Sequence, residues 1–100
     1  IVNKEHIIVE ADYNNLFIWV DCCHADLTDE EEGLLSTALW SYKYQINCSL
    51  CVRNFRKPHK QYQFIIDAAQ IDLVVKRLVE IVKELFPNKL VEFSEKNKYY

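Results

Sequence analysis

Four cysteines and one neighbouring histidine are the residues of this chain whose type and spacing could hold a metal ion. Cys48 and Cys51 have the spacing of half a zinc site, and Cys22-Cys23-His24 could supply the remaining ligands. If residues 46–52 form a strand, however, Cys48 and Cys51 point to opposite faces and cannot converge on one tetrahedral ion. We therefore expect no metal and no cofactor, and we keep a small zinc-binding domain as an alternative.

The cysteines could also pair with one another, because an even count permits disulfides in a secreted protein. A Cys22–Cys48 bond would then join neighbouring strands. Four cysteines in 100 residues are fewer than disulfide-dependent scaffolds contain, and a chain of this length can bury a core without such bonds. We therefore expect free thiols in a reducing compartment, which predicts a cytoplasmic location.

Nucleophilic catalysis would need a histidine beside a nucleophile, a third group that orients it and an oxyanion hole. His6, His24 and His59 are scattered over separate segments, and nothing in the sequence indicates the hole. The chain has one glycine, which argues against a glycine-rich phosphate loop. We therefore expect that the protein is not an enzyme.

Charge is spread unevenly along the chain, whose formal net charge is −3. An acidic cluster consists of Asp26, Asp29, Glu30, Glu31 and Glu32, and a basic cluster of Arg53, Arg56, Lys57 and Lys60. Because the chain as a whole is acidic, bulk electrostatics do not favour a polyanionic partner. The acidic cluster could dock on a basic protein surface, although Thr28-x-x-Glu31 is also the capping box of a helix.

Hydrophobic periodicity predicts five strands and two helices. We expect the strands at 6–12, 16–22, 46–52, 61–67 and 89–94. We expect the helices from Thr28 to about Lys43 and from a cap at Asp67 to Phe86, with turns at 13–15 and 54–59 and a polar tail at 95–100. On the second helix, Asp72–Lys76 and Lys76–Glu80 have the spacing of ion pairs one turn apart.

The element order predicts the fold class, which is α+β. After the first strand the order is βαββαβ, the arrangement of a ferredoxin-like fold. We therefore expect a single domain over 1–100, built as an antiparallel sheet with an extra N-terminal strand and two helices on one face. The other face of the sheet would be open to a partner.

Two segments loosely resemble the strand motifs of RNA-recognition-motif domains, which have the same topology. Residues 16–20 (LFIWV) are similar to the first-strand motif, and residues 60–65 (KQYQFI) to the third-strand motif. The resemblance implies a single-stranded RNA-binding or other nucleic-acid-binding module, in which aromatic side chains stack on bases and basic ones contact phosphates. Its site would be Arg53, Arg56, Lys57, Lys60, Tyr62 and Phe64. Both glycines of the third-strand motif are glutamine here, Gln61 and Gln63.

Our leading hypothesis is a non-enzymatic protein-interaction domain, regulatory or inhibitory. Phe17 and Trp19 would act as apolar anchors on the sheet, because aromatic residues often carry interface energy. The acidic helix start, with Asp29, Glu30 and Glu31, is the other candidate surface. The partner would be another protein or, through an edge strand, a second copy in a homodimer. No apolar run approaches the length of a membrane span, so we expect no membrane partner.

Overall fold

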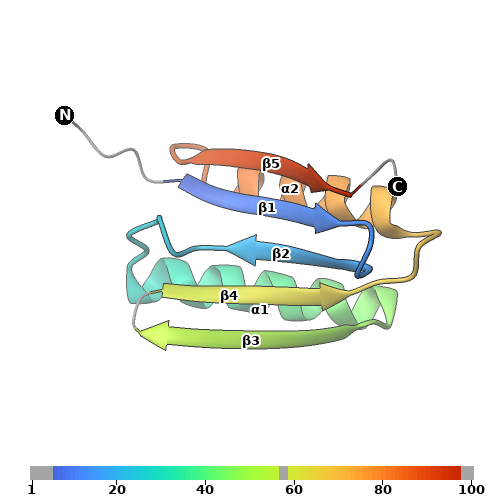
Figure 1. Ribbon diagram of the computed structural model, residues 1–100. Helices are drawn as coiled ribbons and strands as arrows, with labels where there is room; N and C mark the ends of the chain where they lie inside the picture. Colours follow the sequence, from blue (N-terminus) through green and yellow to red (C-terminus); the bar gives the residue numbers. More distant parts are fainter. Residues whose placement is uncertain (1–5, 57–58, 98–100) are drawn as a thin grey trace.

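The computed structural model describes residues 6–56 and 59–97, with the side chains of 54–56 and 59 left outside the description (Figure 1). It contains the five strands and two helices that the periodicity predicts. They are β1 (His6–Asp12), β2 (Phe17–Asp21), α1 (Asp29–Ile46), β3 (Ser49–Arg56), β4 (His59–Ile65), α2 (Ile71–Leu85) and β5 (Leu90–Lys96). The prediction of a small α+β domain is confirmed.

The five strands form one mixed sheet in the order β3-β4-β2-β1-β5. β1 pairs antiparallel with β2 and parallel with β5, so the expectation of an antiparallel sheet throughout was wrong. The ferredoxin-like order is not confirmed either. The reason is the position of β1, which forms a hairpin with β2 and occupies the place beside it, so that β5 pairs with the far side of β1.

Both helices lie on the same face of the sheet, as expected (Figure 1). The core sits between the two layers, and alternate residues of the strands supply the side chains on its sheet side. Ile7, Val9 and Ala11 of β1 are fully buried, as are Ile18 and Val20 of β2. The helices contribute buried residues at helical spacing, which are Leu35, Leu39 and Tyr42 of α1 and Ile71, Val74, Val75, Leu78, Ile81 and Val82 of α2. No helix in the described ranges is long and apolar enough to cross a membrane.

The predicted N-terminal cap forms at one of the two helices and not at the other. At α1 the capping box is confirmed, since the Thr28 hydroxyl accepts from the Glu31 N–H and the Glu31 carboxylate accepts from the Thr28 N–H. At α2 the predicted cap at Asp67 was wrong. Residues 67–70 form a turn in which the Gln70 N–H donates to the Asp67 carbonyl, and the helix begins at Ile71 without a side-chain cap.

Several strand boundaries also differ from the prediction. α1 continues through Ile46 and ends where Asn47 adopts a left-handed conformation (φ 54°), so β3 begins at Ser49. It then extends to Arg56, with a register irregularity between Asn54 and Arg56. At the other end of the chain, β5 runs to Lys96, two residues into the segment expected to be a polar tail.

A buried carboxylate, that of Asp12, holds the turn between β1 and β2. Its Oδ1 accepts from the backbone N–H groups of Asn14 (3.0 Å) and Asn15 (3.1 Å) and from the Asn97 amide (3.3 Å), while Oδ2 accepts from the Asn15 amide (3.1 Å). The turn closes with Leu16 at φ 58°, which is why β2 begins at Phe17 rather than at the predicted Leu16. Burial alone would raise the pKa of Asp12, but the donated hydrogen bonds lower it from 3.8.

We predict that Asp12→Asn destabilises the fold by about 1–3 kcal/mol at neutral pH, because an amide nitrogen would then face N–H donors. Since the pKa of Asp12 is lower in the folded state, its contribution is full above the unfolded pKa and is lost as the pH falls through the folded value. Urea unfolding as a function of pH should therefore show a smaller loss of stability below about pH 4 in the variant than in the wild type. Asp26→Asn, at an exposed position, is the control. Equal unfolding free energies and equal acid limbs for wild type and Asp12→Asn would contradict this role.

Candidate interaction face of the sheet

The sheet has one face that the helices leave uncovered, and β2 places its aromatic side chains there. Because Ile18 and Val20 point into the core, Phe17, Trp19 and Asp21 point the other way. All three are only partly buried. The sequence left this choice open, since both faces of the strand are apolar, and the structure assigns the predicted anchors Phe17 and Trp19 to the uncovered face.

Phe17 and Trp19 contact one another on this face. Their ring centroids are 5.5 Å apart with an interplanar angle of 71°, the edge-to-face geometry that aromatic quadrupoles favour. Ile65 of β4 lies opposite Phe17 in the strand register and is 47% exposed. Together, Phe17, Trp19 and Ile65 form an apolar patch, which we call the sheet-face patch.

Arg53 reaches the same patch from the edge strand β3. Its guanidinium carbon lies 5.4 Å from the centroid of the Trp19 ring, within the range of a cation–π contact. Arg53 was predicted as a phosphate contact, and the register of the β3–β4–β2 strands is what brings it to Trp19 instead. The sequence carried no signal for this contact, because it depends on pairing between strands more than 30 residues apart.

A polar row borders the sheet-face patch on one side. The Gln61 amide donates to Asp21 Oδ2 (2.9 Å), and the Cys23 N–H donates to Asp21 Oδ1 (2.8 Å). Glu10 of β1 and Gln63 of β4 lie on either side of Trp19 in the register. The uncovered face therefore combines an aromatic centre with satisfied or solvated polar neighbours, which is the composition of many protein interfaces.

The acidic helix start is partly used within the fold. Glu31 caps the helix and lies 3.8 Å from the Lys89 ammonium, and Glu32 forms an ion pair with Lys60. The hydrogen bond from the Thr28 backbone, together with Lys89, lowers the pKa of Glu31 despite its desolvation. Asp29 and Glu30 are exposed. Of the three acidic residues predicted as a docking surface, two therefore face solvent and the third holds the helix start.

The predicted nucleic-acid site is not assembled as expected. Tyr62 and Phe64 are 1% and 0% exposed, because their register partners Val20 and Ile18 place them on the helix side of the sheet. Neither ring can stack on a base while the core is intact. Lys60 is paired with Glu32, and Lys57 and the side chain of Arg56 lie outside the described residues.

The cysteines are spread over the fold. All four thiols are free, as expected, and the alternative of a Cys22–Cys48 disulfide is not formed. Cys22 donates its N–H to Lys60 at one end of β4, whereas Cys48 precedes Ser49, which pairs with Ile65 at the other end. That separation is about 17 Å along the strand, far beyond disulfide reach. Within residues 6–56 and 59–97, no three His, Cys, Asp or Glu side chains gather where they could hold a metal ion.

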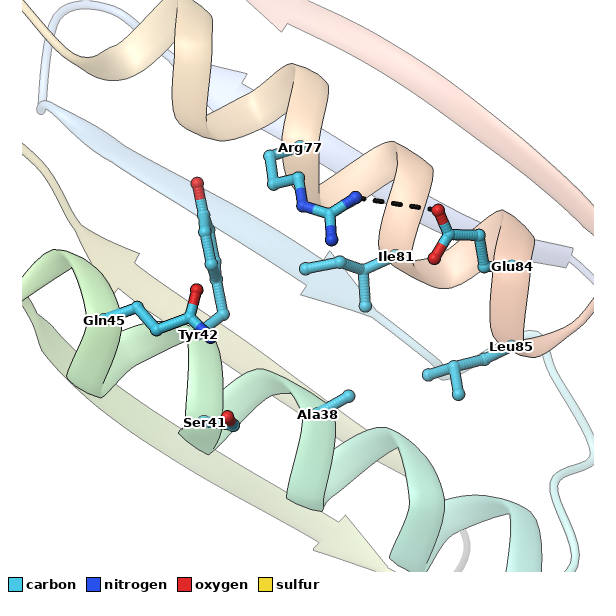
Figure 2. A pocket seen from close by; sticks show the side chains of 8 residues that line it. All are labelled: Ala38, Ser41, Tyr42, Gln45, Arg77, Ile81, Glu84 and Leu85. Atoms are coloured by element: carbon cyan, nitrogen blue, oxygen red, sulfur yellow. Dashed lines mark ion pairs between the residues drawn. The ribbon is translucent and has the colours of Figure 1, made fainter.

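Two further features were not foreseen from the sequence. The imidazoles of His6 and His24 stack with centroids 5.0 Å apart, at the end of the sheet where β1 begins. On the helix side, a groove runs between α1 and α2 (Figure 2). Arg77 bridges along its α2 wall to Glu80 (3.4 Å) and Glu84 (3.6 Å). Facing them are the α1 residues Ala38, Ser41, Tyr42 and Gln45.

Three comparisons with known proteins found nothing similar to this chain. A scan against models of protein families, a search of curated proteins and a search of solved structures each returned no match.

Thiol reactivity tests the placement of the cysteines. Burial raises the pKa of Cys22 to about 12, and burial with a hydrogen bond to Asp21 raises that of Cys23 to about 11. Cys51, in contrast, is exposed on β3. We predict that iodoacetamide modifies Cys51 first in the folded protein and Cys22 only on unfolding, because the thiolate is the reactive form. Peptide mass mapping reads the order, with Cys51→Ser as the control. Rapid labelling of Cys22 in the folded state would contradict this placement.

Proposed function

We propose that the protein is a non-enzymatic interaction domain, regulatory or inhibitory, that binds a protein partner through the uncovered face of its sheet. The observation that supports the proposal is the sheet-face patch. Phe17 and Trp19 meet edge to face at its centre, on the side that neither helix covers. The other two apolar residues of β2, Ile18 and Val20, point into the core.

The contacts around Trp19 favour binding for an energetic reason. Its ring lies between Phe17 and the Arg53 guanidinium, so its position is set before a partner arrives. A side chain that is already ordered loses little rotamer entropy on association. Tryptophan and arginine are also the residue types enriched among those that dominate interface energies. The partner we expect presents an apolar side chain to the patch and an acidic group to Arg53.

The acidic helix start is the weaker candidate for the primary contact. Glu31 and Glu32 are engaged with Lys89 and Lys60, so a partner would compete with those contacts. Asp29 and Glu30 could add long-range attraction to a basic partner, which affects the association rate more than the affinity.

Nucleic-acid binding is supported less well than protein binding. With Tyr62 and Phe64 in the core, a base could stack only on Phe17 or Trp19. Arg53, a basic residue on that face, already covers the Trp19 ring.

Substitution of Trp19 tests the proposal. Protein fragments selected from a display library for binding to the wild-type domain should bind Trp19→Ala about 30-fold more weakly, the loss typical of a central interface residue. Tyr44→Ala is the matched control, because it removes an aromatic ring that is 70% exposed on α1. Far-ultraviolet circular dichroism and a cooperative thermal unfolding transition check that both variants fold.

Two outcomes would argue against the sheet face. Selected binders that tolerate Trp19→Ala and Arg53→Ala but lose affinity with Tyr44→Ala would move the interface to the helices. An affinity for oligouridine that falls steeply with salt and depends on Trp19 would favour the nucleic-acid module instead.

A further inference from the structure

The sheet has two edge strands, and they differ in regularity. β3 carries the register irregularity between Asn54 and Arg56, a feature that protects an edge from pairing with another chain. β5 is paired with β1 in continuous register over seven residues and contains no proline. Its outer side therefore presents a regular row of backbone donors and acceptors on which another strand can pair.

A groove lies beside this edge, between β5 and α2. Its apolar floor is formed by Val75 and Val79 of α2 and by Phe93 of β5. Phe93 lies opposite Val9 in the register and so points to the helix side of the sheet, yet it is 48% exposed. A residue that belongs to the core face but is half exposed indicates that the core is incomplete along this edge.

The rim of the groove carries charges in an alternating order along α2. They are Asp72, Lys76, Glu80 and Lys83. The predicted pairs Asp72–Lys76 and Lys76–Glu80 are not the ones that form, because Arg77 is the partner of Glu80, at 3.4 Å. In the described part of the chain, neither Lys76 nor Lys83 makes an ion pair. Two ammonium groups thus line the groove without an ion-pair partner of their own.

α2 and β5 lie beside each other, since residues of both elements line the same groove. The Tyr13 hydroxyl contacts Asp72 Oδ1 (2.5 Å) and Glu95 Oε2 (3.0 Å), which places the first turn of α2 beside the end of β5. A 15-residue helix and a seven-residue strand both span about 23 Å. The middle of β5 is Phe93, and it lines the groove together with Val75 and Val79, near the middle of α2 at Leu78.

The charges along the rim match those of a second copy of α2 that is rotated by 180° about the middle of the helix. A two-fold rotation that exchanges the ends of α2 brings Lys76 to Glu80 of a second helix, and Asp72 to Lys83. An isologous interface needs this property, because each residue meets its counterpart in reverse order. The strand and the helix thus share one position for a two-fold axis, at Phe93.

We propose that the α2–β5 edge is the interface of a homodimer, in which the β5 strands of two copies pair antiparallel across a two-fold axis at Phe93. The two sheets then form one continuous ten-stranded sheet, and the two Phe93 rings close the grooves. Backbone hydrogen bonds and apolar burial supply the affinity. The exposed ion pairs contribute less energy, but they select the register and exclude other partners. The inference is independent of the proposed function, since the sheet-face patch stays uncovered in the dimer.

Sedimentation velocity and native mass spectrometry of the whole chain test the interface. The wild type should be a dimer, and Phe93→Glu should be a monomer that keeps its circular dichroism spectrum, because the side chain is half exposed. Val52→Glu is the matched control on the other edge strand, at a residue 37% exposed, and should stay dimeric. A monomeric wild type at hundreds of micromolar, or dissociation by Val52→Glu instead of Phe93→Glu, would overturn the proposal.

Charge exchange tests the two-fold register. Lys76→Glu places like charges opposite Glu80, and Glu80→Lys places them opposite Lys76, so each variant alone should dimerise roughly tenfold more weakly. An equimolar mixture of the two should form a heterodimer, because both contacts become attractive again. Misfolding cannot produce this rescue. If both variants dimerise like the wild type, or if the folded variants show no heterodimer when mixed, the proposed register is wrong.

Discussion

The pairing of β1 with two neighbours is the constraint on which the rest of the structure depends. Ile7, Val9 and Ala11 are fully buried, so this strand contributes side chains to the core along its length. Its turn, held by the buried Asp12 carboxylate, commits β2 to one side. β5 can then pair only on the other side, parallel to β1. The position of β1 thereby fixes the order of the sheet, the place of α2 and the identity of both edge strands.

This layered arrangement separates the two surfaces to which we assign binding. Helices on one side of a sheet leave the other side to solvent or to a partner, and here that side carries Phe17 and Trp19. The α2–β5 groove lies at the edge, where the helix layer ends before the sheet does. Because the two surfaces share no side chain, one can be occupied without blocking the other.

The sequence predicted local structure better than pairing. The alternation in residues 6–12 and the capping box at Thr28 were enough to place a strand and a helix start, because both signals lie within a few residues. The side chain directions in β2 and β4 were not predictable in the same way. Ile18 and Phe17 are both apolar, and Tyr62 and Phe64 carry the aromatic pattern of a stacking surface. The choice between core and surface is made by strand register, and a shift of one residue reverses it.

The candidate site was predictable only in part for the same reason. Aromatic residues in a strand identified Phe17 and Trp19, but the contact of Arg53 with Trp19 follows from β3–β4–β2 pairing. Likewise the parallel pairing of β1 with β5 joins residues about 84 positions apart, from His6 with Leu90 to Asp12 with Lys96. No local pattern encodes such a contact. The absence of a cap at Gln70 also shows that packing of an amphipathic face can begin a helix without a side-chain signal.

Parallel pairing of β1 and β5 has a mechanical consequence. The chain enters the sheet at His6 and leaves it at Lys96, at opposite ends of two adjacent strands (Figure 1). A pull between these two points runs along the strands, so it loads all the hydrogen bonds of the pair together in shear. An antiparallel pair, pulled at one end, would open bond by bond. Forced unfolding is governed by the unfolding barrier rather than by equilibrium stability. The geometry therefore gives the domain resistance to tension that its free energy of folding alone would not reveal.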